Sequence, residues 1–236
     1  GDVLDIKTPA NRWDYLSGVG LARELAAHDE GQGVVEPAVG EYSYKNTDYV
    51  NVKAREENRR FVSAKLRVKN DVKSPAWLVD NLAANGIAAH NPVVDITNFV
   101  MLELGQPSHA YDATALTGPL EVRYAQKGEK ITTLDDELRE LTEQDLVVCD
   151  GTGPVGLAGV MGGASSQIRA ETTEIVLEAA HWDKSCIRKT AVRHGLRTEA
   201  SSRFERPIPL PLPQKAFSRL LDLLTEICEA EITEGP

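Results

Sequence analysis

The sequence predicts an α+β fold with mixed or antiparallel sheets and flanking helices. Strand-like and helix-like segments follow one another without the regular alternation of a doubly wound sheet. Two segments read as helices with their own start and stop signals, and later strand-like segments lie between turn signals. A chain of 236 residues, 42% of them hydrophobic, can bury one sizeable core, alone or with an appended piece.

The first third of the chain divides into a helix, a connection and a strand. Residues 1–7 alternate like a short strand, and residues 15–28 predict a helix because their apolar side chains fall mostly on one side. Residues 29–49 carry glycine and proline with little periodicity, which is typical of a connection between two units. Residues 61–68 alternate apolar and polar side chains as a half-buried strand does.

Two helices carry residues that set their limits. In the first, Ser74 suits the N-cap, Pro75 the first helical position and Gly86 the C-terminal stop. The second, residues 93–104, ends at Gly105, and the Gln-Pro-Ser-His that follows indicates a turn. Further strands are expected at 120–125, 130–134, 145–149 and 174–180, and further helices near 184–195 and around 214–229.

The composition excludes several classes of protein. No run approaches the roughly 20 apolar residues of a membrane-spanning helix, and the first residues lack the features of a signal peptide. Cys149, Cys186 and Cys228 are far apart, odd in number and match no metal-binding spacing. We therefore expect a cytoplasmic protein with buried thiols, no membrane contact and no metal site.

Charge is distributed unevenly along the chain. The net charge of −10 argues against a general nucleic-acid binder, and no DNA partner is expected. Residues 183–206, however, hold seven bases and three acids, a net charge of +4 that leaves −14 on the remainder. A basic strip on an acidic body fits a protein that contacts one defined phosphate backbone; a solvated helix face is the plainer alternative.

Polar residues near the second helix have two possible roles each. Thr97 and Asn98 lie on an otherwise apolar helix, where they can bond local backbone or hold a water or ligand carbonyl at a pocket wall. His109, in the turn after Pro107, is either a structural hydrogen-bonding residue or a catalytic group. With Asp112 it offers only two metal ligands, too few for a metal site.

A glycine-rich segment and a buried acid complete the candidate site. Residues 156–163 (GLAGVMGG) hold four glycines, which allow a ligand to approach the backbone closely. They match neither a P-loop nor the dinucleotide fingerprint, so they fit a pocket wall better than a nucleotide site. Glu178 lies in an apolar strand, where its carboxylate is either paired internally or offered to a ligand hydroxyl. No Ser-His-Asp order or activated nucleophile is present in the sequence.

Taken together, four motifs resemble the beta subunit of bacterial phenylalanyl-tRNA synthetase, in the same order and over most of the chain. The resemblance implies that residues 1–36 are the second half of a small α/β N-terminal domain and that residues 37–236 form the editing module. The chain would then be a fragment without an aminoacylation site. The motifs are NRWDYLSGVGLARELAA, VVDITNFVMLELGQPSHAYD, GLAGVMGG and IVLEAAHWDKSCIRKTAVRHGLRTEASSRFER.

In that family the module hydrolyses tyrosine wrongly attached to tRNA(Phe) by means of a positioned water. The resemblance implies that Glu178 accepts the tyrosyl hydroxyl and that Asn98, with Thr97, positions the water and the ester. His109 would lie near the terminal adenosine as a candidate acid–base group. Pro107, Gly159, Gly162, Thr198 and Ala200 would line the pocket, and Arg188, Lys189, Arg193 and Arg197 would contact the tRNA.

The resemblance also implies partners: tRNA(Phe) and the alpha subunit, in an assembly of two alpha and two beta subunits. No cofactor is expected in this fragment, because ATP and Mg²⁺ act elsewhere in the whole synthetase. The sequence departs from the family at Ala10, at Ala88, where arginine is usual, and at the proline-rich residues 207–213. A scaffold with decayed editing is therefore the alternative, and a free-standing trans-editing protein is a third, which the expected half domain disfavours.

Overall fold

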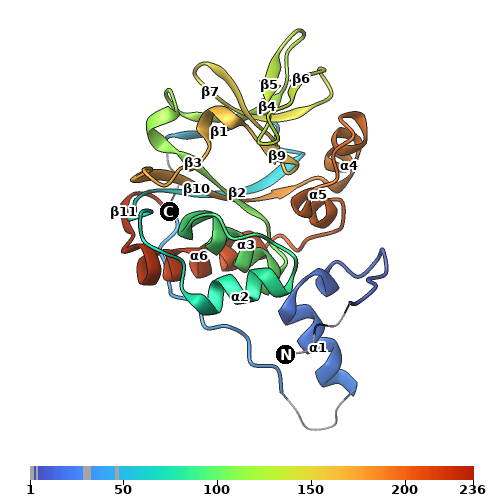
Figure 1. Ribbon diagram of the computed structural model, residues 1–236. Coiled ribbons are helices and arrows are strands. Elements are labelled where there is room, and N and C mark those ends of the chain that lie inside the picture. Colours follow the sequence, from blue (N-terminus) through green and yellow to red (C-terminus); the bar gives the residue numbers. More distant parts are fainter. Residues whose placement is uncertain (1–2, 4, 29–32, 46–47) are drawn as a thin grey trace.

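Two β-sheets and a layer of helices form the main body of the computed structural model, which describes residues 3, 5–28, 33–45 and 48–236 (Figure 1). All strand pairs are antiparallel except β1 with β4, so the predicted α+β class with mixed and antiparallel sheets is confirmed. The first sheet has the order β1 (Val50–Val52), β4 (Leu120–Tyr124), β7 (Leu146–Asp150), β8 (Gly153–Leu157) and β9 (Met161–Gly162). The second has the order β11 (Glu231–Glu234), β2 (Asn58–Arg67), β10 (Glu174–Trp182) and β3 (Ser108–Asp112), and β5 (Lys130–Thr132) pairs with β6 (Leu138–Glu140).

Three helices cover one face of the second sheet, and two others lie at its side (Figure 1). The face turned away from the first sheet packs against α2 (Ala76–Ala84), α3 (Pro92–Leu104) and α6 (Leu212–Cys228). Helices α4 (Lys184–Arg193) and α5 (Glu199–Phe204) border the space between the two sheets. The remaining helical elements are α1 (Gly18–His28) and the 3-10 turns η1 (Asp14–Leu16), η2 (Ala113–Ala115) and η3 (Ala164–Ser166).

Strand β10 is the central element because its two faces serve two different cores. Side chains alternate across a strand. Ile175 and Leu177 therefore pack into the core under the helices, whereas Val176 and Ala180 pack into the core between the sheets. Glu178 belongs to the second set, so the alternation turns its carboxylate toward the space between the two sheets.

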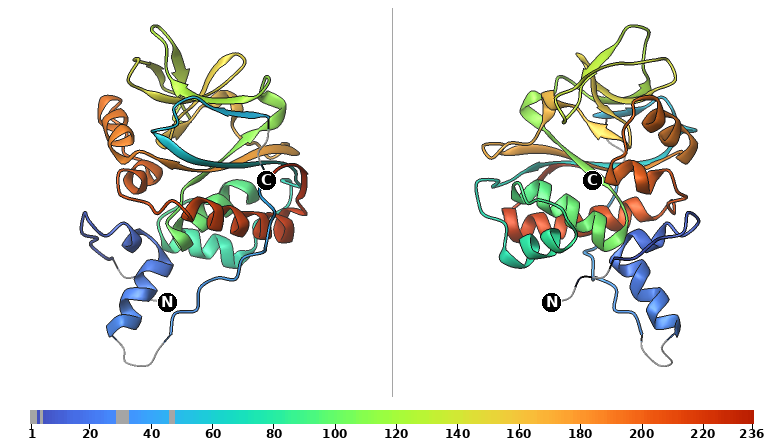
Figure 2. Two further views of the ribbon diagram at one scale, coloured as in Figure 1. Left: turned by 180° about the vertical axis from the view of Figure 1, so that it is seen from behind. Right: turned by 45° about the vertical axis from the view of Figure 1, so that its right-hand side comes forward.

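The N-terminal part is attached to this body through α1 and an extended segment. Residues 33–45 run along the helix layer without regular secondary structure (Figure 2). There the Tyr42 hydroxyl and the Gly40 N–H both donate to the Asp222 carboxylate of α6, each at 2.8 Å. The buried Arg203 guanidinium donates to the Leu16 carbonyl at 3.0 Å, which ties the N-terminal segment to α5. Among the described residues no helix is long and apolar enough to cross a membrane.

Most predicted elements are present, with ends shifted by a few residues. The predicted stops of two helices are confirmed, since Gly86 and Gly105 have left-handed φ values of 74° and 82°. The remaining predicted helices correspond to α1, α4 and α6, and the predicted strands after residue 60 to β2, β4, β5, β7 and β10.

Three local predictions are wrong. The N-cap of α2 is Pro75, because the Ser74 hydroxyl instead donates to the buried Asp95 carboxylate of α3 at 2.5 Å. His109 lies on strand β3 and not in a turn. Of the strand predicted at 1–7, residues 1, 2 and 4 lie outside the described residues. The others form no strand, since Val3 is 70% exposed and no neighbouring strand pairs with this segment.

Replacing Gly105 with alanine should destabilise the fold more than the same change at Gly86. Both glycines have positive φ, so each substitution costs about 1–2 kcal/mol of backbone strain. A Cβ at Gly105 would also lie 3.2 Å from the Ser17 Cβ, whereas one at Gly86 would meet nothing within 4 Å. Urea unfolding of Gly105→Ala and Gly86→Ala measures the difference, and equal losses would contradict a role for Gly105 in docking the N-terminal segment.

Candidate functional site

A pocket of about 230 Å³ opens between the two sheets, bordered by α3, β3, the β8–β9 segment and α5. Beside the residues predicted from the sequence, the pocket is lined mostly by apolar side chains, including Met101, Leu134, Val148, Trp182 and Phe204. The structure thus brings together residues that are more than 100 positions apart in the sequence. All nine predicted pocket residues line it: Thr97, Asn98, Pro107, His109, Gly159, Gly162, Glu178, Thr198 and Ala200.

Glu178 is a buried carboxylate with one hydrogen-bond partner. The residue is 6% exposed, and its Cα pairs with His109 of β3 on one side and Ser63 of β2 on the other. The Tyr111 hydroxyl donates to Glu178 Oε2 at 2.7 Å. Burial raises the pKa of Glu178 to about 7, and the hydrogen bond from Tyr111 opposes that rise.

His109 is held in the pocket as a neutral imidazole. Gln106, fully buried, donates to the carbonyls of Ala180 and Pro107 and so fixes the start of β3. Burial lowers the pKa of His109 to about 4. Its buried Nε2 has no hydrogen-bond partner among the described residues, so the atom is free to bond a ligand or water.

Thr97 and Asn98 differ in how free their side chains are. The Thr97 hydroxyl donates to the Val94 carbonyl at 2.7 Å, which is the local backbone bond considered from the sequence. No hydrogen bond joins the Asn98 amide to another described residue, although the side chain lines the pocket. Asn98 is therefore the helix residue that can offer both a donor and an acceptor to a ligand.

The two predicted glycines are needed for different physical reasons. A Cβ at Gly162 would lie 2.7 Å from His109 Nε2, so this glycine makes room for the imidazole. A Cβ at Gly159 would lie 2.8 Å from Ile187 Cδ1 and 3.0 Å from Trp182 Cδ1, and its φ is 66°. The main role of Gly159 is therefore to allow a left-handed turn and close packing against Ile187 and Trp182. Its contribution to open space in the pocket is smaller.

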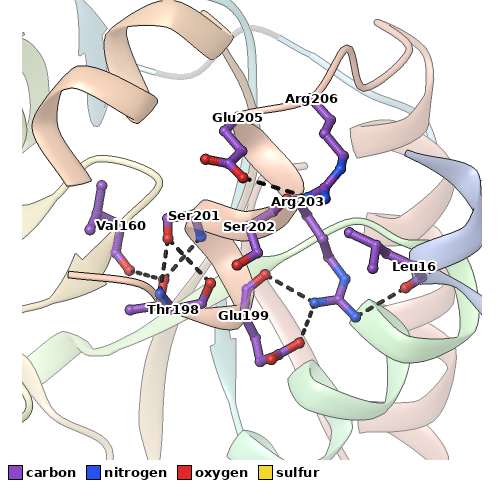
Figure 3. A network of polar contacts seen from close by, with 9 residues as sticks. All are labelled: Leu16, Val160, Thr198, Glu199, Ser201, Ser202, Arg203, Glu205 and Arg206. Carbon is purple, nitrogen blue, oxygen red and sulfur yellow. Dashed lines mark hydrogen bonds and ion pairs between the residues drawn. The ribbon is translucent and has the colours of Figure 1, made fainter. Parts of the chain in front are cut away.

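The opposite wall is fixed by a network around the N-terminus of α5 (Figure 3). Thr198 caps the helix, since its hydroxyl oxygen accepts from the Ser201 N–H at 2.9 Å. The same hydroxyl donates to the Val160 carbonyl at 2.8 Å, which joins α5 to the turn between β8 and β9. Arg203 donates to the Glu199 carboxylate at 2.6 Å, so the wall is connected in turn to the N-terminal segment.

The four predicted tRNA-contacting residues border two different hollows. Consecutive residues on a helix point roughly 100° apart, and Arg188 and Lys189 accordingly face different hollows. Arg188 and Arg197 border a hollow that also contains Arg206. Lys189 and Arg193 border another hollow, which is also lined by the acids Glu56, Glu57, Glu143 and Asp183. Arg193 is, in addition, paired with the buried Asp145.

Sequence reasoning assigned no role to Tyr111. The signal was available, because Tyr111 follows His109 by two residues and side chains two apart share one face of a strand. Its ring packs edge-on to the His109 imidazole, with 4.4 Å between centroids. Ala88, the departure noted in the sequence, is exposed and does not line the pocket. Among the described residues no group of three His, Cys, Asp or Glu side chains could hold a metal ion.

The chain belongs to the B3/4 domain family, which it matches over residues 57–229. Its relatives include proteins named phenylalanine–tRNA ligase beta subunit, which confirms the resemblance drawn from the motifs. That of Geobacillus kaustophilus is 42% identical over 99% of this chain and 30% of its own length. That of Mannheimia succiniciproducens is 39% identical over 98% of this chain and 29% of its own length.

The chain therefore spans about 30% of the length of these relatives. Among solved structures, an N-terminal fragment of the phenylalanyl-tRNA synthetase beta subunit from Pyrococcus horikoshii is similar at 15% identity. The match covers 84% of this chain and 64% of that chain, with a TM-score of 0.43.

The pKa of His109 predicts a specific dependence of stability on pH. An unfolded imidazole titrates near 6.5, whereas folded His109 stays neutral down to about pH 4. The unfolded state therefore binds the proton first, and His109 costs stability as the pH falls from 6.5 toward 4. Relative to His109→Gln, the wild type should lose about 3 kcal/mol over this range. Urea unfolding at each pH tests this, with His28→Gln as the control at an exposed site.

Proposed function

We propose that this pocket hydrolyses the ester of tyrosine wrongly attached to tRNA(Phe), as the editing module of a phenylalanyl-tRNA synthetase beta subunit. The observation that carries the proposal is Glu178, a buried carboxylate that lines an otherwise mostly apolar pocket. Such a carboxylate is costly to bury, and a ligand that brings a hydroxyl to it offsets part of that cost.

In this proposal the buried carboxylate of Glu178 recognises the hydroxyl group that distinguishes tyrosine from phenylalanine. A pocket shaped for phenylalanine cannot strongly reject an isostere that only adds a hydroxyl. A second pocket that requires the hydroxyl provides the missing discrimination. A phenylalanyl ester here would desolvate Glu178 without supplying a donor, at a cost of about 1–3 kcal/mol or more for a charged group.

Hydrolysis would proceed through a positioned water, without a covalent intermediate. The Asn98 amide and the free His109 Nε2 both line the pocket and are available to orient the water and the ester. His109 is neutral near pH 7 and its pKa of about 4 makes it a weak base, so its free Nε2 serves there as a hydrogen-bonding group. Thr97 already donates its hydroxyl proton to the Val94 carbonyl, which leaves its oxygen as an acceptor.

The whole enzyme would bind tRNA(Phe) and an alpha subunit, in a cytoplasmic assembly of two alpha and two beta subunits. ATP and Mg²⁺ would act at a synthetic site outside this chain. Within the chain, Arg188 and Arg197 are the better candidates for phosphate contacts, because their hollow holds Arg206 and a single acid, Glu205, which is paired with Arg206. Arg193 is already paired with Asp145, and acids border the hollow that Lys189 shares with it.

A scaffold without editing activity is the competing function. Ala88 favours it, since the family usually has arginine there. Residue 88 is exposed and lies outside the pocket, so the absence of an arginine there leaves the set of lining residues complete. A scaffold would bind tRNA and its partner subunit and leave Tyr-tRNA(Phe) intact.

Replacing Glu178 with alanine should reduce selectivity for tyrosine by about 10- to 100-fold. The variant loses the acceptor for the substrate hydroxyl, which is worth about 1–3 kcal/mol. The measurement is the deacylation rate of Tyr-tRNA(Phe) against Phe-tRNA(Phe) by the intact enzyme that carries this chain. Glu174→Ala removes an exposed acid from the same strand and is the matched control. Unchanged selectivity in Glu178→Ala would exclude this carboxylate as the discriminating group.

Replacing Asn98 with alanine should instead slow both deacylations together. Its amide would orient the water and the ester, which are common to the two substrates, so kcat should fall by about 100-fold with little change in selectivity. Single-turnover rates separate this effect from binding. Asn85→Ala, at the exposed end of α2, controls for loss of a helix amide. A fall in tyrosine hydrolysis alone would assign Asn98 to side-chain recognition instead.

A further inference from the structure

A resident tyrosine already occupies one oxygen of the carboxylate that is proposed to recognise tyrosine. Tyr111 is 1% exposed, and its phenol donates to Glu178 Oε2 at 2.7 Å. Both residues line the pocket, and they come from the adjacent strands β3 and β10. A carboxylate has two oxygens that can each accept hydrogen bonds. The bond to Tyr111 leaves Oε1 without a hydrogen-bond partner among the described residues.

We propose that Tyr111 is a specificity-determining positioning residue, whose phenol holds Oε2 so that an ionised Glu178 presents Oε1 to a second phenol in the pocket. The inference rests on the proposed function of the pocket and adds to it a residue that acts through Glu178. Tyr111 would do so by fixing both the direction and the charge of the acceptor.

Charge is the critical property, because an ionised acceptor binds a phenol more strongly than a neutral carboxylic acid does. Burial raises the pKa of Glu178 to about 7, and the hydrogen bond from Tyr111 lowers it. Burial and the adjacent carboxylate raise the pKa of Tyr111 well above its usual value, so its phenol remains a donor. Tyr111 therefore favours the form of Glu178 that discriminates.

The other groups around this pair do not titrate near neutral pH or are paired elsewhere. His109, beside Tyr111 on β3, has a pKa lowered to about 4 by burial, and Cys149 on β7 has one raised to about 12. Ser63, opposite Glu178 on β2, carries no charge. Glu199 also borders the pocket, but its carboxylate is exposed and paired with Arg203. Glu178 is thus the group whose ionisation should set the pH dependence of selectivity.

The direction of that dependence follows from the charge. Tyrosine selectivity should be full above the pKa of Glu178 and should decline as the pH falls through about 7. Removing the Tyr111 hydroxyl removes an interaction that lowers this pKa, so the midpoint should move to higher pH. A purely structural role for Tyr111 would instead reduce activity by the same factor at every pH.

The test is the pH profile of selectivity for Tyr111→Phe between pH 6 and 9.5, measured as the ratio of kcat/KM for Tyr-tRNA(Phe) and Phe-tRNA(Phe). The variant should lose about tenfold in selectivity at pH 7.5 and recover it above pH 9. Tyr124→Phe is the matched control, since Tyr124 donates to Glu57 in a surface pair outside the pocket. An unshifted midpoint, or a loss that is equal at every pH, would overturn the inference.

A second readout does not require hydrolysis. The carboxyl ¹³C resonance of Glu178, assigned with Glu178→Gln, should titrate at higher pH in Tyr111→Phe than in the wild type. If the wild type fails to hydrolyse Tyr-tRNA(Phe), the proposed function fails, and this titration still tests the coupling. An identical Glu178 titration in the wild type and Tyr111→Phe would overturn the inference.

Discussion

The structure depends on the alternation of strand β10 between two cores. One face of the strand seals the core under α3 and α6, and the other faces the first sheet. A single polar residue in the second set, Glu178, therefore lies inside the protein with little access to water. Shifting the strand by one residue would place its carboxylate under the helices, so the pairing of β10 with both β2 and β3 fixes the chemistry of the pocket.

The surrounding elements each contribute one constraint to the same pocket. Helix α3 supplies the Asn98 amide, and its end at Gly105 allows the chain to turn toward β3. Gly162 leaves space for the imidazole of His109, and Thr198 ties α5 to the segment that carries the glycines. The proposed discrimination between two esters by one hydroxyl group would require rigid supports of this kind.

Local signals in the sequence predicted the long elements, whereas long-range contacts decided the exceptions. Gly86 and Gly105 ended their helices as expected, because the left-handed conformation is a local property. Strand β3 was missed because proline and glycine before it indicate a turn, and its pairing partner lies more than 60 residues away. Ser74 is not the N-cap because of another long-range contact, in which its hydroxyl donates a hydrogen bond to Asp95 of α3.

The nine pocket residues were predicted from the resemblance of the motifs, because the residue chemistry alone left a structural role open for the buried acid and for the polar residues of the helix. Tyr111 was not predicted: its spacing from His109 indicates a shared strand face, but only the pairing of β3 with β10 shows that its hydroxyl reaches Glu178. The most direct test of the central claim is deacylation of Tyr-tRNA(Phe) and Phe-tRNA(Phe) by the wild-type enzyme that carries this chain. Fast hydrolysis selective for the tyrosyl ester is predicted. Hydrolysis no faster than the uncatalysed rate, with tRNA binding intact, would contradict the account and indicate a scaffold.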